Sequence, residues 1–193
     1  MSLEQIKKIR EVTGAGMVDV KKALDESAGD ETKAIEILRK NGQAKALKKS
    51  DREAKEGVIG SYVHSNNKVS AMVKLYCETD FVARNEEFKE LAKDIAMHIS
   101  AMNPRFLSPE NVSQEIISKE KEIWVEQLKN EGKSEEIMEK IMEGKEKKFK
   151  EEISLLTQSF VKNPDLTIEQ LITEKIGKIG EKIQVGEFSR FEL

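Results

Sequence analysis

The hydrophobic period of the chain changes at Gly57, and this change limits the folds that are open to it. Before Gly57, apolar residues recur every three or four positions, which is the spacing of an amphipathic helix. From Val69 to Cys77 the odd-numbered positions are all apolar, which is the spacing of a half-buried strand. Ser65-Asn66-Asn67-Lys68 precedes that stretch and predicts a hairpin turn. We therefore expect an α+β protein with strands at about 57–65 and 68–78.

A third strand is predicted at the end of the chain, from 182 to 193. Ile183 and Phe191 share one parity, whereas Phe188 has the other. A β-bulge near Gly186 accounts for this slip, because a bulge adds one residue to one strand of a pair. The strand pairs most simply with the hairpin before it. We expect a three-stranded antiparallel sheet.

Residues 1–42 predict three short helices. Ser2 and Gln5 form a capping box for the first, and Thr13-Gly14-Ala15-Gly16 ends it. Asp30 caps the third, which we expect to end at Asn41-Gly42. A unit of about 40 residues is close to the lower size limit for folding alone, so it is expected to lean on or bind something else. Residues 43–56 are rich in Ala, Lys and Glu without an apolar stripe, which is typical of a solvated helical linker.

A long helix is predicted after the second strand, beginning at Thr79 or Asp80. Its buried stripe is formed by Phe88, Leu91, Ile95 and Ile99. Phe81 precedes Phe88 by seven residues and so can share this stripe. It also lies on the first helical turn, where a side chain can project beyond the core. The sequence leaves both positions open.

A long charged helical hairpin is predicted as an insertion at about 113–162, within a core domain of 57–193. Its apolar positions are Ile116, Ile117, Ile123, Trp124 and Leu128 on the first helix and Ile137, Ile141, Phe149, Ile153 and Leu156 on the second, which Gly144 is expected to loosen. Asn130 to Lys133 is the expected turn, and Asn163-Pro164 the expected end. Thr167 and Gln170 form another capping box and open a further helix.

Composition and charge exclude several classes of protein. The net charge of −3 argues against a dedicated nucleic-acid binder, and the basic stretch from Lys45 to Lys55 is interrupted by acidic residues. The single cysteine, Cys77, excludes an intrachain disulfide and lies on the apolar strand face, which predicts a buried, inert thiol. We find neither a signal peptide nor a membrane-spanning run, so we expect a cytoplasmic protein with no membrane contact.

No pattern of residues predicts catalysis, a cofactor or a metal. The two histidines, His64 and His98, lack the spacing of metal ligands, and the acidic residues are scattered over helix faces. Thr13 to Met17 lacks the Gly-Lys-Ser/Thr ending of a phosphate-binding loop and follows a helix rather than a strand. We therefore expect an interaction protein and not an enzyme. A general helical adaptor and a small enzyme of unknown chemistry remain the alternatives.

Two motifs together carry a resemblance to a known family. Lys-Ile-Arg-Glu-Val-Thr-Gly-Ala-Gly-Met (Lys8 to Met17) and Thr-Asp-Phe-Val-Ala-Arg-Asn (Thr79 to Asn85) resemble the two signatures of elongation factor Ts. This family exchanges guanine nucleotide on elongation factor Tu during bacterial translation. The resemblance covers the whole chain. It implies a ubiquitin-associated-like N-terminal domain and a core with a small antiparallel sheet.

The resemblance also implies a homodimer. Longer members of the family carry the core twice, whereas this chain has one copy and resembles the short form, in which two chains supply both halves. Met72 and Tyr76 make the second face of the predicted strand unusually apolar for a surface in water, which fits a second layer there.

Site residues are implied by matching this chain to the family motifs. The residues that contact the nucleotide domain of the partner match Asp80 and Phe81, with Thr79 and Val82 beside them. In the family the phenylalanine wedges between two helices of that domain and disturbs its magnesium and phosphate-loop region, so that GDP leaves. Direct binding of nucleic acid is not implied.

A second set of partner contacts is implied at the first motif. Arg10 and Met17 match N-terminal residues that touch the same domain of the partner near its guanine-binding side. Val18 stands where some relatives have Met.

Overall fold

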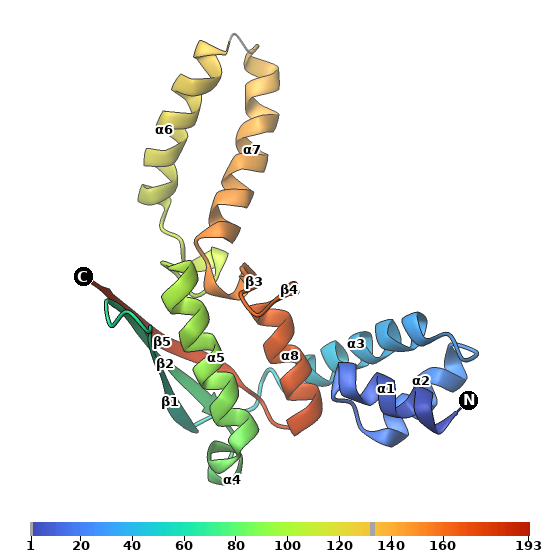
Figure 1. Cartoon of the computed structure of the whole chain (residues 1–193). Coiled ribbons are helices and arrows are strands. Elements are labelled where there is room, and N and C mark those ends of the chain that lie inside the picture. The colour runs from blue at the N-terminus through green and yellow to red at the C-terminus, as the bar shows by residue number, and fades with distance from the viewer. Residues whose placement is uncertain (1, 132–133) are drawn as a thin grey trace.

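The computed structural model describes residues 2–131 and 134–193, and its fold is the expected α+β class. Figure 1 shows an antiparallel sheet at one side, the helix α5 across it, then α8, then α3 with the rest of the N-terminal helices. A helical hairpin rises from one end. Among the described helices, none is both long and apolar enough to cross a membrane.

The sheet contains the three strands that the sequence predicts. They are β1 (Glu56–Val63), β2 (Val69–Cys77) and β5 (Gln184–Glu192), in the order β1-β2-β5 with antiparallel pairing throughout. Val73 pairs with Phe188, whereas Leu75 pairs with Val185, so two residues of β5 oppose one residue of β2. This confirms the β-bulge expected near Gly186.

One face of the sheet is covered by α5 (Glu86–Met102). The predicted stripe of α5 is confirmed, because the side chains of Phe88, Leu91, Ile95 and Ile99 are all buried. The helix comes very close to β1. A Cβ atom built on Gly60 would lie 2.3 Å from the carbonyl oxygen of Ala92. Gly60 therefore sets the distance between α5 and the sheet.

Cys77 is fully buried at the end of β2, as expected. Burial, followed by the nearby Glu181 carboxylate, raises the pKa of its thiol to about 11. The neutral thiol is therefore the stable form at physiological pH, which is the form expected of an inert cysteine.

The single long helix predicted from Thr79 or Asp80 is wrong. The structure has a short α4 (Asp80–Arg84) and a separate α5, divided at Asn85, whose backbone is extended with φ −67° and ψ 131°. The side chain of Asn85 accepts a hydrogen bond from the N–H of Glu87 at 2.8 Å and so caps α5. Local capping thus outweighs the continuous helical period.

The next layer is α8 (Ile168–Ile179), whose predicted capping box between Thr167 and Gln170 is confirmed. Glu87 of α5 accepts hydrogen bonds from two lysines of α8, Lys175 at 2.6 Å and Lys178 at 2.7 Å. Before α8 lies a small hairpin of β3 (Ser159–Phe160) and β4 (Asn163–Thr167) that the sequence does not predict. Its strands are too short to produce a readable alternation.

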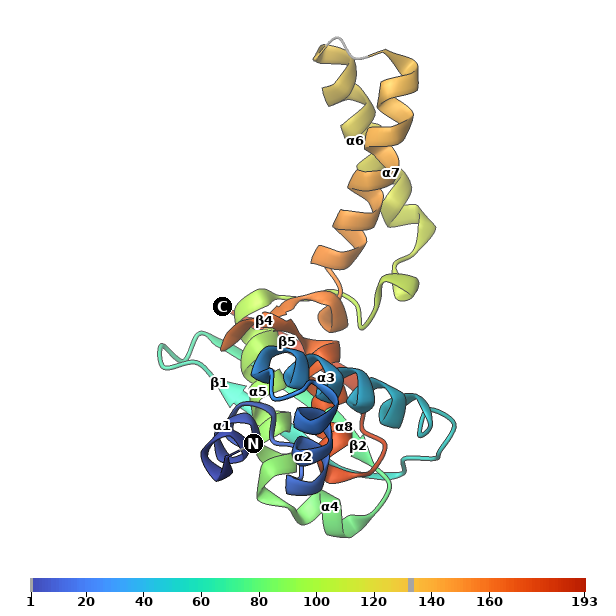
Figure 2. The same cartoon turned by 90° about the vertical axis from the view of Figure 1, so that its right-hand side faces the viewer.

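The predicted helical hairpin is present as α6 (Gln114–Asn130) and α7 (Glu135–Glu152), and Figures 1 and 2 both show it projecting from the body of the protein. The rings of Trp124 and Phe149 meet edge to face at 5.6 Å between centroids. The helix α7 runs through Gly144 without a break, and contrary to expectation it ends before Ile153 and Leu156. Short 3-10 helices, η1 (Pro109–Asn111) and η2 (Leu155–Thr157), flank the hairpin. The predicted turn at 130–133 extends beyond the described residues.

Three helices form the N-terminal unit, as predicted: α1 (Leu3–Thr13), α2 (Met17–Glu26) and α3 (Glu31–Leu47). They enclose a core of their own, formed by Ile6, Ile9, Val20, Ala23, Leu24, Ala34 and Leu38. The expected end of α3 at Asn41-Gly42 is wrong, because the helix continues to Leu47. The helical linker predicted at 43–56 is wrong beyond that point, because residues 48–55 are not helical. A Cβ atom built on Gly177 of α8 would lie 3.5 Å from the Cα of Gly42, so the two helices cross at a pair of glycines. This packing offsets the roughly 1 kcal/mol helix cost of Gly42.

Candidate functional site

The second motif forms α4 and presents one large apolar side chain to solvent. Thr79 caps the helix, since its hydroxyl accepts a hydrogen bond from the N–H of Val82 at 3.4 Å. Ala83 is buried and Val82 packs partly against the core. Phe81, in contrast, is 79% exposed. The inner residues of α4 anchor the helix, and Phe81 projects from it.

The break at Asn85 explains why Phe81 lies outside the core. Phe88 is completely buried although it follows Phe81 by seven residues, a spacing that would place both on one face of a continuous helix. Since α4 and α5 are separate helices, the helical repeat is interrupted at Asn85 and the two side chains point in different directions. The position that the sequence left open is thereby decided in favour of solvent.

Asp80 occupies the first turn of α4, where a carboxylate interacts favourably with the exposed N–H groups of the helix. It is 3.0 Å from the guanidinium of Arg84, one turn later. The carboxylate remains partly exposed, with 44% of the side chain accessible. Thr79, Asp80, Phe81 and Val82 thus share one short element, with the polar group and the aromatic ring both accessible.

The first motif forms the turn between α1 and α2. Gly14 has φ +65° and donates its N–H to the carbonyl oxygen of Arg10 at 2.8 Å, which ends α1. Met17 is the first residue of α2 and is 53% exposed. Arg10 is also exposed. The two predicted N-terminal residues therefore lie on either side of one tight turn.

Exposed apolar side chains gather along the sequence at this turn. Besides Met17, Val12 and Val18 are both largely exposed. Val18 thus offers an apolar group to solvent although it is smaller than Met. An apolar turn of this kind on the surface is typical of a contact site for another protein.

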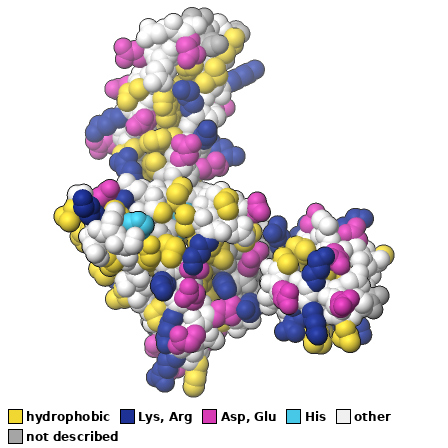
Figure 3. Space-filling view, in the orientation of Figure 1, with side chains coloured by type: hydrophobic (Ala, Val, Ile, Leu, Met, Phe, Trp, Pro, Cys, Tyr) yellow, Lys and Arg dark blue, Asp and Glu magenta, His cyan; other side chains and the backbone are white. Residues whose placement is uncertain are grey.

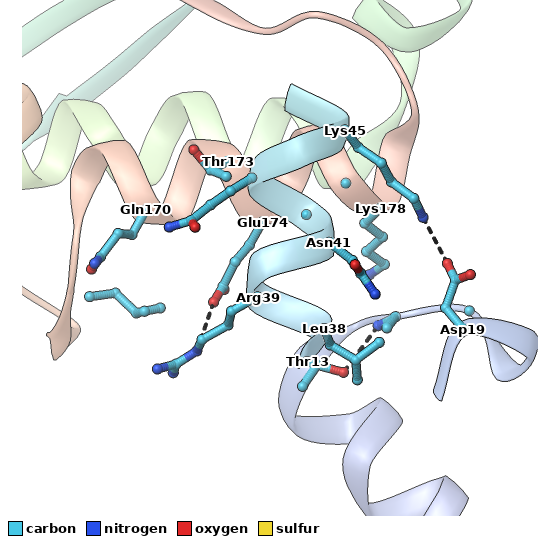
Figure 4. Close-up of a pocket in the computed structure, with 16 residues that line it drawn as sticks. Thr13, Asp19, Leu38, Arg39, Asn41, Lys45, Gln170, Thr173, Glu174 and Lys178 are labelled. Atoms are coloured by element: carbon cyan, nitrogen blue, oxygen red, sulfur yellow. Dashed lines mark hydrogen bonds and ion pairs between the residues drawn. The ribbon is translucent and has the colours of Figure 1, made fainter. Parts of the chain in front are cut away.

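The N-terminal unit is held to the core through α8. The aliphatic stem of Lys178 reaches Gly14, where a Cβ atom would lie 3.1 Å from the lysine Cδ. Arg39 of α3 approaches Glu174 of α8 at 3.7 Å. These side chains surround a pocket between α3, α8 and the α1–α2 turn (Figure 4). The volume of this cavity is about 230 Å³.

The charged groups that line this pocket have partners of opposite charge. Lys45 approaches Asp19 at 2.8 Å, and Lys178 is bonded to Glu87. Burial raises the pKa of Glu174, although the nearby Arg39 opposes this effect. We therefore interpret the pocket as part of the interface between the N-terminal unit and the core. Sequence reasoning did not find it, because the elements around it are distant in the sequence.

The face of the sheet opposite α5 carries apolar side chains that the chain leaves uncovered. Ile59, Val63, Met72 and Phe191 are all exposed on it. Tyr76 lies over the bulge, where a Cβ atom on Gly186 would be 2.5 Å from its ring. Figure 3 shows hydrophobic side chains along the margin of the molecule where the sheet lies. Polar groups interrupt this face, since Lys74 pairs with Ile59 in the sheet and forms an ion pair with Glu187. Even so, this many exposed apolar side chains on one sheet face is unusual on a monomer.

The described residues offer these surfaces without a metal centre. In residues 2–131 and 134–193, no three His, Cys, Asp or Glu side chains gather in a group able to hold a metal ion. The exposed aromatic ring and the apolar turn are groups that bind a protein by shape and burial of apolar area.

Comparison with known proteins identifies the family. A family profile described as Elongation factor TS matches residues 3–193. The chain is 54% identical over its whole length to Elongation factor Ts of Thermodesulfovibrio yellowstonii, covering 96% of that protein, and 54% identical to Elongation factor Ts of Thermosipho melanesiensis, covering 98%. It is 52% identical over 98% of its length to Elongation factor Ts of Carboxydothermus hydrogenoformans, covering 88% of that protein. The two motifs, the fold and these matches agree, and the chain belongs to the elongation factor Ts family.

Proposed function

We propose that this protein is a guanine-nucleotide exchange factor that binds elongation factor Tu and promotes release of GDP during the elongation step of protein synthesis. The observation that carries the proposal is the exposure of Phe81, a large aromatic side chain held out on an anchored helix. Such a residue has no role in the core and is typical of the buried anchor of a protein interface. Membership of the elongation factor Ts family supports the identity of the partner.

The proposed mechanism is a wedge. Phe81 enters between two helices of the nucleotide domain of elongation factor Tu and disturbs the magnesium and phosphate-loop region, while Thr79, Asp80 and Val82 line the contact. Arg10 and Met17 hold the same domain at a second point. The protein acts by binding alone, without a catalytic group, a cofactor or a metal of its own. This function implies the cytoplasm, where translation takes place.

Linkage between the two ligands explains how binding releases GDP. Suppose that the factor binds the nucleotide-free partner more tightly than the GDP-bound partner. The bound factor must then lower the affinity of the partner for GDP by the same ratio as GDP lowers its affinity for the factor. A coupling of about 3 kcal/mol corresponds to roughly 150-fold. Burial of one Phe side chain contributes ~1.5–3 kcal/mol. Phe81 can therefore supply much of the coupling but not all of it, and contacts at the N-terminal turn account for the rest.

The same proposal includes a homodimer formed through the open face of the sheet. Ile59, Val63, Met72 and Phe191 are hydrophobic and exposed there, and burying them against a second copy removes them from water. A two-fold pairing uses one surface on both copies, as most homodimers do. The N-terminal unit would serve as a ubiquitin-associated-like domain beside this core.

Release of a fluorescent GDP analogue from elongation factor Tu tests the function directly. We expect strong acceleration by the native protein and little by Phe81→Ala, with the variant folded as judged by circular dichroism. Ile137→Ala is a matched control, because it removes an exposed apolar side chain on the distant helical hairpin. Absence of acceleration by the native protein would refute the proposed function, and an unfolded Phe81→Ala would show that Phe81 is part of the core.

A further inference from the structure

Glu181 binds the segment that begins α4, although it is 103 residues from Glu78 in the chain. One oxygen of its carboxylate accepts hydrogen bonds from the backbone N–H groups of Glu78 and Thr79, both at 3.0 Å. The other oxygen accepts from the Thr79 hydroxyl at 2.6 Å. A carboxylate that receives three hydrogen bonds is a strong acceptor, because each bond is charge-assisted.

Glu78 makes the reverse connection. Its carboxylate accepts a hydrogen bond from the backbone N–H of Lys182 at 2.6 Å and another from the guanidinium of Arg52 at 3.2 Å. The backbone hydrogen bond from Lys182, followed by the bond from Arg52, lowers the pKa of the Glu78 carboxyl. Each junction, from β2 to α4 and from α8 to β5, thus supplies a glutamate that binds the backbone of the other.

The segment after α3 joins the same cluster. The ammonium group of Lys182 donates to the carbonyl oxygens of Ser50 and Arg52, both at 2.8 Å. Arg52 lies in the stretch that connects the N-terminal unit to β1. We call Arg52, Glu78, Glu181 and Lys182 the clasp. It connects the start of α4 to the segment that leads from the N-terminal unit.

The clasp matters for Phe81 because α4 cannot fix its own direction. A helix of five residues is too short to be stable by itself, since helix nucleation is unfavourable. The direction of α4 is therefore set by its ends and by the burial of Ala83. The Thr79 hydroxyl donates to Glu181 and accepts from the N–H of Val82, so Glu181 acts on the turn that carries Phe81.

We propose that Glu181 is a positioning residue for nucleotide exchange, which acts by holding α4 so that Phe81 points into the partner. Glu78 and Lys182 transmit this hold to the connection with the N-terminal unit. Glu181 does not touch the partner. The inference rests on the proposed function, because it assigns Glu181 a role through Phe81. A fixed ring binds better than a mobile one, since less conformational freedom is lost on binding.

The test combines Glu181→Gln with Phe81→Ala in a double-mutant cycle. Glutamine keeps the size of the side chain but replaces one acceptor oxygen with an NH2 group, which cannot accept the hydrogen bonds made there. We expect Glu181→Gln to lower the maximal rate of GDP release about tenfold, the loss expected when one charge-assisted hydrogen bond is removed. In the Phe81→Ala background we expect no further loss, because coupled residues are not additive.

Two more variants separate positioning from a general effect on the fold or the charge. Glu90→Gln removes one carboxylate from the exposed surface of α5 and should leave the rate unchanged. Glu78→Gln weakens the bonds that the other glutamate of the clasp accepts from Lys182 and Arg52, and it should lower the rate in the same direction as Glu181→Gln. It provides a second route if Glu181→Gln folds poorly. The melting temperature of each variant is measured in parallel.

Fluorine NMR reports on the ring at position 81 in the absence of the partner. With 4-fluorophenylalanine at position 81, we expect one sharp fluorine resonance in the native protein and a broadened or shifted one in Glu181→Gln.

The outcomes of the cycle distinguish the two proposals. If the native protein does not accelerate release, the proposed function fails and this inference fails with it. If the native protein is active and Phe81→Ala is impaired, but Glu181→Gln is unaffected or costs the same in both backgrounds, only the positioning role is overturned. An unchanged fluorine resonance in Glu181→Gln would also overturn it.

Discussion

The Nε2 atom of His98 lies 3.0 Å from the side-chain oxygen of Gln158, and its Nδ1 atom accepts a hydrogen bond from the N–H of Val161 at 3.2 Å. Both nitrogens are satisfied only by the neutral ring with its proton on Nε2. Gln158 in turn donates to the carbonyl oxygen of Glu152 at 2.7 Å, at the end of α7. His98 therefore ties α5 to the base of the helical hairpin.

We predict that acid destabilises the protein through His98. Burial lowers the pKa of this histidine below its usual 6.5, although its bond to Gln158 opposes the shift. Below about pH 6.5 the unfolded chain therefore binds a proton that the folded chain does not. The free energy of unfolding should fall as the pH decreases below that value and show no contribution from His98 above it. Urea unfolding at pH 7.5 and pH 5 measures the difference.

The comparison of His98→Gln with His64→Gln assigns this effect. Because His64 is exposed, its replacement should leave the pH dependence of the native protein in place. His98→Gln should reduce that dependence. An equal pH dependence in both variants would mean that other groups cause the acid sensitivity.

Replacing two phenylalanines seven residues apart should change the free energy of unfolding by very different amounts. Phe88→Ala removes a fully buried ring and should lower the free energy of unfolding by about 3–5 kcal/mol. Phe81→Ala removes an exposed ring and should change it by less than about 0.5 kcal/mol. Urea denaturation of both variants checks this. A large loss in Phe81→Ala would contradict the separation of α4 from the core.

The spacing between α5 and the sheet predicts the effect of a single methyl group. Gly60→Ala would place a Cβ atom 2.3 Å from the carbonyl oxygen of Ala92, so α5 must shift. The expected cost is about 1–3 kcal/mol of unfolding free energy. Gly144→Ala is the matched control, because its Cβ meets no atom within 4 Å on α7 and should stabilise the helix by ~0.5–1 kcal/mol. Thermal unfolding compares them, and equal changes in both would rule out the packing explanation.

The open sheet face predicts the oligomeric state. At micromolar concentration the native protein should sediment as a dimer. Met72→Glu introduces a charge at the centre of this face and should yield a monomer with an unchanged circular dichroism spectrum. Ile137→Glu, on the hairpin, should remain dimeric. A native protein that sediments as a monomer would refute the dimer.

Features that depend on residues close together in the sequence were predicted correctly. The strand from Val69 to Cys77, the bulge near Gly186 and the capping boxes at Ser2 and Thr167 all agree with the structure. Each is set by side-chain period or by hydrogen bonds that span a few residues, so the local sequence contains the physical cause. The expected end of α3 at Gly42 was wrong, since contact with Gly177 favours helix at a residue that disfavours it alone.

The α+β class, the helical hairpin and the two motifs of the elongation factor Ts family can all be read from the amino-acid sequence alone. Two features become visible only in the folded protein: Phe81 faces solvent while Phe88 is buried, and Glu181 holds Thr79. The first depends on a helix break that competes with a continuous apolar period. The second joins residues 102 positions apart. Such contacts are selected by packing of the whole chain, and no local pattern contains them.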